Sequence, residues 1–301
     1  MATVIVDKVS KQFGNTHAVV DVSFTVAPGQ VFGLLGPNGA GKTTTIRMML
    51  DIIRPDSGRI QLFGGPMSED KKNRIGYLPE ERGLYADIKL MDVILYLASL
   101  KGMARPAAAK AAEKYLKQLD LWQHRDKKMN ALSRGMHQKA QFIVTILHDP
   151  DLIIVDEPFS GLDPVNTELI RNMLLDLRDR GKAIIMSTHQ MHQVEAMCDY
   201  MVLIHRGRVV LDGPVNEVRR RFAGNTVEVA GDGAFEQLPQ VELAQHRNGR
   251  WHLTLADGVN PQLFLRDLAR RDDLFIEHFS MALPGLDEIF IRIVGQDADQ
   301  P

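Results

Sequence analysis

The fold of this 301-residue chain is decided by residues 36–44, which read Gly36-Pro37-Asn38-Gly39-Ala40-Gly41-Lys42-Thr43-Thr44. The spacing of Gly36 from Gly41-Lys42-Thr43 is that of a phosphate-binding loop, whose backbone N–H groups close around the α- and β-phosphates of a nucleotide. In such a loop Lys42 reaches the β- and γ-phosphates, and the hydroxyl of Thr43 binds Mg²⁺. This stretch therefore predicts a binding site for a nucleoside triphosphate.

The flanking sequence has the pattern that such a loop needs. Residues 30–35 form a short apolar run typical of a β-strand, and residues 44–50 begin a helix. Strand, loop and helix in this order turn the positive end of the helix dipole and its free N–H groups towards the anion. A chance glycine-rich turn does not explain this context, so we expect a P-loop NTPase core.

The composition limits the class of protein. With 25% charged and 45% hydrophobic residues the chain is typical of a globular protein, and 301 residues suffice for two domains. The formal net charge of -2 gives no electrostatic reason to expect a nucleic acid partner. No apolar run approaches the ~18 to 20 residues of a membrane-spanning helix, and residues 1–10 lack the pattern of a signal peptide, so we expect a cytosolic protein.

Hydrophobic periodicity divides the chain into segments. Residues 20–26 alternate like a half-buried strand, and apolar residues then recur at helical spacing in an insert at about residues 86–150. Continuous apolar runs at 152–155 and 183–187 are typical of parallel strands buried on both faces. This order predicts an α/β fold in residues 1–222, namely a P-loop NTPase core with an antiparallel β subdomain and a helical insert.

Residues 223–301 are expected to form a second, small α+β accessory domain. Three stretches in it alternate like half-buried strands, and one stretch has the spacing of an amphipathic helix. No catalytic constellation is evident in this part of the sequence. The expected strands are residues 226–229, 251–255 and 288–294, and the expected helix is 261–271 with Leu263, Phe264 and Leu268 facing inward.

Two acidic residues, Asp156 and Glu157, directly follow the apolar run at 152–155. Open α/β sheets bind their ligands at the carboxyl ends of the strands, so we expect these carboxylates beside the phosphate loop. Asp156 is then a candidate Mg²⁺ ligand, directly or through water, and Glu157 is a candidate base for the water that attacks the γ-phosphate. The alternative is a strand that ends in two solvated acids, and the phosphate loop argues against it.

Three further motifs occur in a fixed order around this strand. They are Leu132-Ser133-Arg134-Gly135-Met136 before it, and Ser160-Gly161-Leu162-Asp163 and Ser187-Thr188-His189 after it. With this ordered set the chain resembles, over about residues 3–221, the nucleotide-binding subunit of an ABC transporter. The resemblance implies an ABC ATPase fold, ATP and Mg²⁺ as cofactors, and a homodimer or heterodimer of ATP-binding subunits that encloses two ATP molecules.

The resemblance also implies roles for single residues. In that family Ser133 and Gly135 would face the γ-phosphate bound by the other subunit, and Asp163 would cross the dimer interface. Phe13 would stack on adenine, and His189 would contact the γ-phosphate and hold the attacking water in place. Each of the last two has a simpler alternative, because a lone Phe is usually a core residue and a lone His is usually a hydrogen-bonded structural group.

Two positions depart from the pattern of this family. The glutamine that usually follows the strand at 77–79 is Glu80, and the usual Leu-Ser-Gly-Gly-Gln signature contains Arg134 and Met136. A carboxylate at position 80 can still bind Mg²⁺, but it adds negative charge near the γ-phosphate. Arg134 adds positive charge near the same phosphate from across the interface, and we hypothesise that the two partly compensate. The block at 76–85 also resembles a bacterial subgroup of sodium and drug efflux subunits.

The resemblance implies an ATPase that drives a membrane transporter, and in this subgroup an exporter. Integral membrane permease subunits are the expected partners, with a contact around residues 83–91, and the chain would lie on the inner face of the cell membrane. The main alternative is a soluble ABC-type ATPase that acts on ribosomes or DNA, but such relatives usually have two cassettes or long coiled coils, which this sequence lacks. A small-molecule kinase or GTPase would leave the signature motif, Asp163 and His189 unexplained.

Overall fold

The computed structural model describes residues 2–81, 83–247 and 249–298. The chain forms two compact units, Met1–Val215 and Asn216–Pro301, and each has a hydrophobic core of its own. The second unit begins within the helix that precedes the predicted division at residue 223. Within the described residues, no helix is both long and apolar enough to cross a lipid bilayer.

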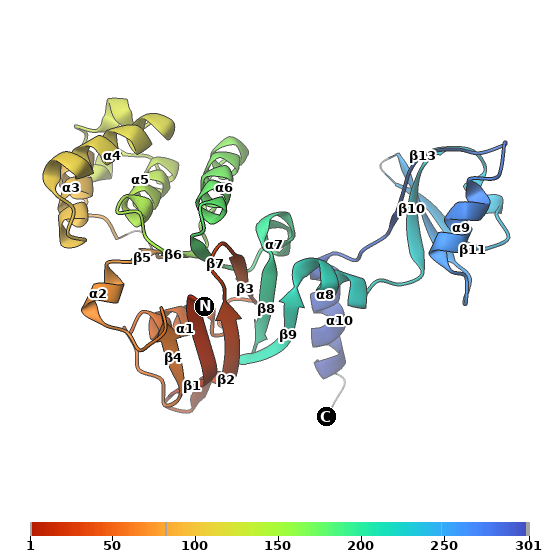
Figure 1. Ribbon diagram of the computed structural model, residues 1–301, viewed down its shortest axis with the longest axis horizontal. Helices are drawn as coiled ribbons and strands as arrows, with labels where there is room; N and C mark the ends of the chain where they lie inside the picture. The colour runs from red at the N-terminus through yellow and green to blue at the C-terminus, as the bar shows by residue number, and fades with distance from the viewer. Residues whose placement is uncertain (1, 82, 248, 299–301) are drawn as a thin grey trace. The chain divides into compact units, whose positions relative to one another are not determined.

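A six-stranded sheet forms the centre of the first unit (Figure 1). Its strand order is β5-β6-β7-β3-β8-β9, and all neighbours are parallel except β8 and β9, which form a hairpin. β6 and β7 are buried along their whole length, as expected for parallel strands that are covered on both faces. The strands are β3 (Val31–Leu35), β5 (Ile75–Leu78), β6 (Leu152–Asp156), β7 (Ala183–Thr188), β8 (Tyr200–His205) and β9 (Arg208–Pro214).

A second, antiparallel sheet in the order β2-β1-β4 shares its core with the central sheet. Phe24 of the small sheet stacks on Phe32 of the central sheet, with the ring centroids 4.9 Å apart. In β2 the side chains of Val22, Phe24 and Val26 are buried and alternate with exposed residues, which confirms the predicted half-buried strand. The strands are β1 (Val4–Phe13), β2 (Thr16–Val26) and β4 (Ser57–Leu62).

Helices connect the strands of the central sheet and form the insert (Figure 1). Between β5 and β6 the chain forms α3, α4 and α5, which pack against one another. The helix α1 follows the phosphate loop, and α6 joins β6 to its parallel neighbour β7. The bounds are α1 (Lys42–Met49), α2 (Glu69–Lys72), α3 (Leu90–Leu100), α4 (Arg105–Gln118), η1 (Trp122–His124), η2 (Met129–Ala131), α5 (Arg134–Ile146), α6 (Pro164–Asp179) and α7 (Met191–Met197).

The second unit is built on a four-stranded antiparallel sheet in the order β11-β12-β10-β13. Apolar side chains of β10 and β12 form a core with Phe264 and Leu268 of α9. The unit therefore has the predicted mixture of strands and helices. Its elements are α8 (Val215–Arg221), β10 (Thr226–Asp232), η3 (Phe235–Gln237), β11 (Val241–Arg247), β12 (Arg250–Leu255), α9 (Pro261–Leu268), β13 (Phe275–Met281) and α10 (Leu286–Ala298).

One prediction for this unit is wrong, because residues 288–294 lie in the helix α10 and not in a strand. Glu288 lies in the first turn, where the helix dipole favours an acidic side chain, and it pairs with Arg292 one turn later. Ile289 is fully buried, whereas Ile291 is 69% exposed. Two residues this close would share one face of a strand, so the burial follows the helical period.

The inward orientation predicted for Leu263 is also wrong. Its side chain is 50% exposed, whereas Phe264 and Leu268 are buried. Positions four residues apart lie on the same face of a helix, and this pair occupies the face that meets the sheet. Leu263 therefore lies at the margin of the buried stripe.

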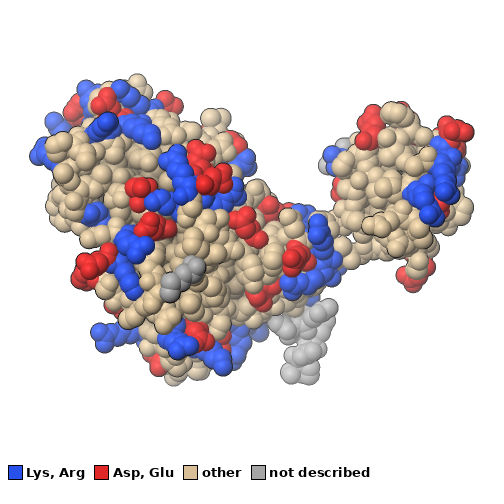
Figure 2. Space-filling model, viewed as in Figure 1, with Lys and Arg blue, Asp and Glu red and all other residues tan. Residues whose placement is uncertain are grey.

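Charged side chains of both signs are distributed over the surface. Lys and Arg are interspersed with Asp and Glu on the face shown in Figure 2. Some of them form exposed ion pairs, such as Arg59 with Asp7 and Arg74 with Asp151. This mixture gives the visible face no broad field of one sign.

Candidate active site

The carboxyl ends of the parallel strands bring the phosphate loop, the two acidic residues and His189 to one edge of the central sheet. β3 leads into the phosphate loop, β6 leads into Asp156 and Glu157, and β7 is followed by His189. A cavity of about 440 Å³ lies at this edge, a size typical of small-molecule sites. Its walls are residues 38–44, the carboxylates Glu80, Asp156 and Glu157, residues 16–18 at the start of β2, and Arg206.

Two glycines fix the path of the phosphate loop. The backbone φ angles are 149° at Gly36 and 108° at Gly41. Residues that carry a Cβ atom rarely adopt positive φ angles of this kind. A Cβ atom at Gly36 would lie 2.2 Å from the carbonyl oxygen of Ile204, and one at Gly41 would lie 2.4 Å from that of Ala18. The loop therefore packs directly against the neighbouring backbone on both sides, which only glycine permits.

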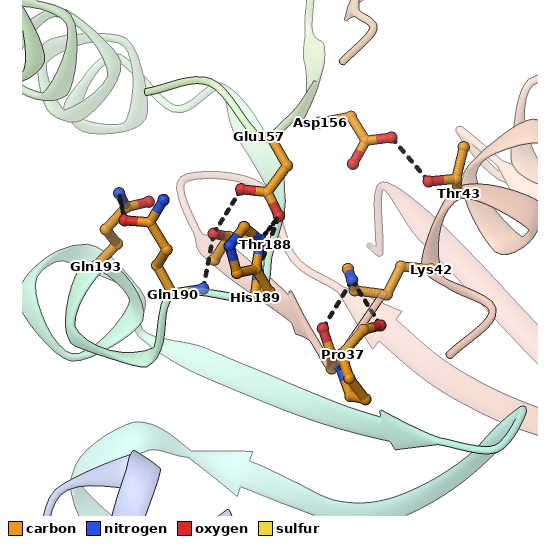
Figure 3. A network of polar contacts seen from close by, with 10 residues as sticks. Pro37, Lys42, Thr43, Asp156, Glu157, Thr188, His189, Gln190 and Gln193 are labelled. Atoms are coloured by element: carbon orange, nitrogen blue, oxygen red, sulfur yellow. Dashed lines mark hydrogen bonds and ion pairs between the residues drawn. The ribbon is translucent and has the colours of Figure 1, made fainter. Parts of the chain in front are cut away.

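Lys42 lies buried beneath this loop. Its ammonium group donates hydrogen bonds to the carbonyl oxygens of Gly36 at 2.7 Å and Pro37 at 3.1 Å (Figure 3). Burial lowers the pKa of Lys42, while the nearby carboxylates, Glu157 first among them, act to raise it. Because both hydrogen-bond partners are neutral, the ammonium charge remains available to an anionic ligand.

The Thr43 hydroxyl and the Asp156 carboxylate lie side by side in the lining of the cavity. The Thr43 hydroxyl donates to Oδ2 of Asp156 at 3.0 Å (Figure 3). Burial raises the pKa of Asp156, and the hydrogen bond from Thr43 opposes this effect. Together with the carboxylate of Glu80 in the same cavity, these hard oxygen atoms fit the preference of Mg²⁺.

No cluster of three or more His, Cys, Asp or Glu side chains could hold a metal ion in the part of the chain that the structure describes. Mg²⁺ is usually bound by one or two carboxylates, substrate phosphates and water, and not by a complete protein cage.

Glu157 is held by three hydrogen bonds in a strained backbone conformation. Its φ angle is 48°, and its side chain is buried. Oε1 accepts from the backbone N–H of His189 at 2.9 Å and from its Nδ1 at 2.6 Å, and Oε2 accepts from the Thr188 hydroxyl at 3.1 Å (Figure 3). An ionised carboxylate can only accept hydrogen bonds, so Nδ1 carries a proton in this pairing. The second ring nitrogen, Nε2, makes no bond to Glu157, and the ring is half exposed.

Ser133, Gly135 and Asp163 do not line this cavity, and the structure places them near one another instead. Ser133 is the N-cap of α5, and its hydroxyl accepts a hydrogen bond from the first turn. Asp163 is the N-cap of α6, and the backbone N–H of Asn166 holds the pKa of Asp163 below its usual range. A Cβ atom at Gly135 would lie 3.7 Å from the carbonyl oxygen of Gly161, in the loop that leads to Asp163.

Phe13 lies at the end of β1, outside the lining of the cavity. It pairs across the hairpin with Thr16, which does line the cavity. The ring is 47% exposed, and the Lys11 ammonium lies 5.6 Å from its centroid. Such exposure counts against the simpler interpretation of Phe13 as a core residue, and its contact with adenine stays a prediction.

The sequence did not reveal the buried polar face of α5. Three of its side chains donate hydrogen bonds to the loops that follow Glu80 and Glu157 and to the first turn of α6. They tie the helix that begins after Ser133 to both loops of the site. The bonds join Gln138 Nε2 to Pro158 O (3.1 Å), Lys139 Nζ to Asn166 Oδ1 (3.0 Å) and Gln141 Nε2 to Glu81 O (3.2 Å).

Thr188 was also missed as a partner of Glu157. Besides donating to that carboxylate, its hydroxyl accepts from the backbone N–H of Gln190 at 3.1 Å. A threonine beside a histidine at the end of a buried strand is a signal that the sequence contained. Its role depends on the pairing of β6 with β7, which only the fold supplies.

Two family models match this chain. The model described as ABC transporter matches residues 19–160, and the model described as ATP-binding protein DrrA1-3-like, C-terminal domain, matches residues 213–294. Both matches agree with the order of units in the structure.

Related proteins match along nearly the whole chain. It is 40% identical to the ABC transporter ATP-binding protein YhaQ of Bacillus subtilis, over 96% of this chain and 98% of the relative. It is 33% identical to the Nod factor export ATP-binding protein I of Paraburkholderia xenovorans, over 98% of both chains. A solved ATP-binding subunit of an ABC transporter superposes with a TM-score of 0.69 and 29% identity, over 73% of this chain and 93% of that structure.

The chain therefore belongs to the ATP-binding proteins of ABC transporters. The predicted fold class is confirmed, and so is the prediction of an ATPase subunit that powers a membrane transporter. The matches give no support to the alternative of an ATPase that acts on ribosomes or DNA.

Proposed function

We propose that the chain binds ATP, holding the phosphates of the nucleotide in the loop at 36–44. It hydrolyses ATP at the γ-phosphate, with Glu157 as the general base. The observation that carries this proposal is that Lys42, Thr43, Asp156 and Glu157 line one cavity. Lys42 and the N–H groups at the start of α1 bind phosphate oxygens, because this helix end carries positive partial charge. Glu157 accepts the proton of the attacking water as the phosphoryl group is transferred.

The Mg²⁺ ion would be held by the oxygen atoms of Thr43, Asp156 and Glu80. When bound, it supplies positive charge that stabilises the charge on the phosphate oxygens during transfer. Glu80 adds a negative charge to this cavity where an amide is usual in the family. We propose that Arg134 of a second subunit offsets part of this charge.

His189 has two tasks in the proposed mechanism. Its backbone N–H and Nδ1 orient the carboxylate of Glu157 through the bonds described above. The ring is half exposed, so Nε2 is free to contact the γ-phosphate or the attacking water. Thr188 fixes the other oxygen of Glu157, and the base is thereby positioned from both sides.

We propose that two such subunits, identical or related, complete each site. Ser133 and Gly135 lie at the N-terminal end of α5, whose unpaired N–H groups favour an anion. They lie outside the cavity of their own chain, which supports a role at the γ-phosphate held by the other subunit. Asp163 follows the loop at Gly161 and Leu162 that packs against Gly135, and it would then lie at the interface of the two chains.

The proposed transport partner is an integral membrane permease, with the chain on the cytoplasmic side of the membrane. Tyr85 and Tyr96 support a contact with it near the predicted stretch at 83–91. Each is 49% exposed, and their rings meet edge to face with centroids 5.8 Å apart. Aromatic side chains exposed in this way are typical of binding surfaces. The export proteins among the relatives support an outward direction of transport.

Two measurements test this function. Affinity purification of the tagged chain from detergent-solubilised membranes should recover a polytopic membrane protein in stoichiometric amount, and recovery of ribosomal proteins would refute the transport role. A Glu157→Gln variant should bind ATP and form stable dimers with it, yet hydrolyse it about 10²-fold to 10⁴-fold more slowly. Hydrolysis at the unaltered rate would exclude Glu157 as the base.

A further inference from the structure

The turn between β8 and β9 packs against the phosphate loop. β8 runs parallel to β3, so its carboxyl end reaches the same edge of the sheet as the loop. The backbone N–H of Gly207 donates to the carbonyl oxygen of Ala40 at 3.0 Å, and the N–H of Val20 donates to that of Gly207 at 2.8 Å. The turn is therefore fixed both to the phosphate loop and to β2.

Arg206 occupies a position in this turn that its residue type disfavours. The φ angles of Arg206 and Gly207 are 48° and 78°, as in a two-residue hairpin turn with both residues in the left-handed region. Gly is preferred there because it has no Cβ atom to crowd the following carbonyl oxygen, and Asn and Asp because their short polar side chains can hydrogen-bond locally. The geometry of the turn therefore does not explain an arginine at this position.

The side chain of Arg206 faces the nucleotide cavity without a protein partner. It lines the cavity together with the phosphate loop and the start of β2. Within the described residues its guanidinium has no hydrogen bond or ion pair, although three carboxylates line the same cavity. An unpaired planar cation at such a position is suited to bind a ligand.

The order of the strands shows which end of the nucleotide Arg206 meets. β3 and its phosphate loop lie between β7 on one side and β8 on the other. Asp156 and Glu157, the proposed Mg²⁺ ligand and base, lie at the carboxyl end of β6 on the β7 side. Arg206 lies on the β8 side, beside residues 16–18. The nucleoside end of the ligand must extend in this direction.

We propose that Arg206 is a nucleotide-binding residue that contacts the base and ribose of ATP. Its guanidinium plane can stack on the face of the base, and its N–H groups can donate to the ribose hydroxyls. This inference rests on the proposed ATP site and adds to it a contact that the phosphate loop does not provide.

The test compares Arg206→Asn with the unaltered protein and with Arg208→Asn. Asn suits the left-handed turn, so the thermal midpoint of Arg206→Asn without nucleotide should equal or exceed that of the unaltered chain. Arg208 is exposed two residues further along the same hairpin and does not line the cavity, which makes it a matched control. Dissociation constants are measured calorimetrically for ATP and for tripolyphosphate, both with Mg²⁺.

The expected result is that Arg206→Asn weakens ATP binding by about fivefold to thirtyfold and changes tripolyphosphate binding by less than about twofold. Arg208→Asn should bind both ligands as the unaltered chain does. Unchanged ATP affinity in Arg206→Asn would overturn the inference alone, and an equal loss for both ligands would show that Arg206 binds phosphate and not the nucleoside. If the unaltered chain bound no ATP, the proposed function would fail first.

Discussion

Replacement of Thr188 by Val should slow ATP hydrolysis while leaving ATP binding intact. Valine has nearly the shape of threonine, so the fully buried site at the end of β7 stays filled. The change removes the hydrogen bond to Oε2 of Glu157 and leaves the N–H of Gln190 without its acceptor. Thr188 does not line the cavity, so the ATP dissociation constant should change by less than about threefold.

The size of the effect follows from the chemistry of the lost bond. A hydrogen bond to a charged group contributes about 1.5–3 kcal/mol. If the bond acts fully on the position of the base in the transition state, its loss lowers kcat by about 10-fold to 150-fold, because 1.36 kcal/mol corresponds to a factor of ten. Phosphate release at saturating MgATP measures this rate, and calorimetry measures the affinity separately.

Thr188→Ser is the matched control, because it keeps the hydroxyl and removes only a methyl group. Its kcat should lie within about threefold of that of the unaltered chain. The reasoning is refuted if Thr188→Val hydrolyses ATP at the unaltered rate. It is also refuted if Thr188→Ser is as slow as Thr188→Val, since packing and not the hydrogen bond would then set the rate.

Three further changes test other parts of the structure. Burial lowers the pKa of His148 to about 4, and its Nε2 hydrogen-bonds to the carbonyl oxygen of Ile75. The unfolded chain binds a proton below about pH 6.5, so His148 lowers the free energy of unfolding as the pH falls from 6.5 towards 4. At pH 5.0 the free energy of unfolding falls by about 2 kcal/mol, or by about 1–2 kcal/mol after allowance for solvent screening. Urea titrations should measure this decrease in the unaltered chain and find it absent in His148→Gln. Glu80→Gln removes a negative charge from the cavity and should tighten ATP binding about threefold to tenfold at low salt, measured calorimetrically. Gly76→Ala would place a Cβ atom 2.2 Å from the carbonyl oxygen of Thr145 in α5, and should lower the free energy of unfolding by about 1–3 kcal/mol in urea.

Each of these three predictions has an outcome that would contradict it. If the free energy of unfolding depended on pH equally in His148→Gln and in the unaltered chain, His148 would not be the buried neutral imidazole that the prediction requires. If Glu80→Gln changed neither ATP affinity nor hydrolysis, the idea that Arg134 compensates Glu80 would be wrong. For Gly76, the control is Gly83→Ala, which adds a Cβ atom in open space and should change stability by less than about 0.5 kcal/mol. Equal stability of the two alanine variants would exclude the steric clash.

The parts of the fold that depend on local patterns were predictable from the sequence. The glycine spacing of the phosphate loop and the continuous apolar runs of β6 and β7 each indicate one backbone conformation when the flanking sequence is taken into account. The alternation at 288–294 was misleading because seven residues fit both periods, and α10 became evident only from the burial of Ile289 against the exposure of Ile291.

The parts of the site that depend on strand order were not predictable. Thr188 meets Glu157 because β7 lies beside β6, and Arg206 meets the cavity because β8 lies beside β3. The latter pairing joins segments that are far apart in the sequence. No local motif marks Arg206, since an arginine before a glycine in a turn usually denotes a solvated hairpin.

The three hydrogen bonds of Glu157 are shared unequally between its oxygens, because Oε1 accepts two from His189 and Oε2 accepts one from Thr188. The bond from the backbone of His189 is fixed by the chain, and the bond from Thr188 is buried, so the imidazole bond is the one that a displacement of the half-exposed ring would break. A neighbouring protein that drew the ring outwards would leave the base less firmly oriented. It would thereby lower the turnover of ATP without touching the nucleotide.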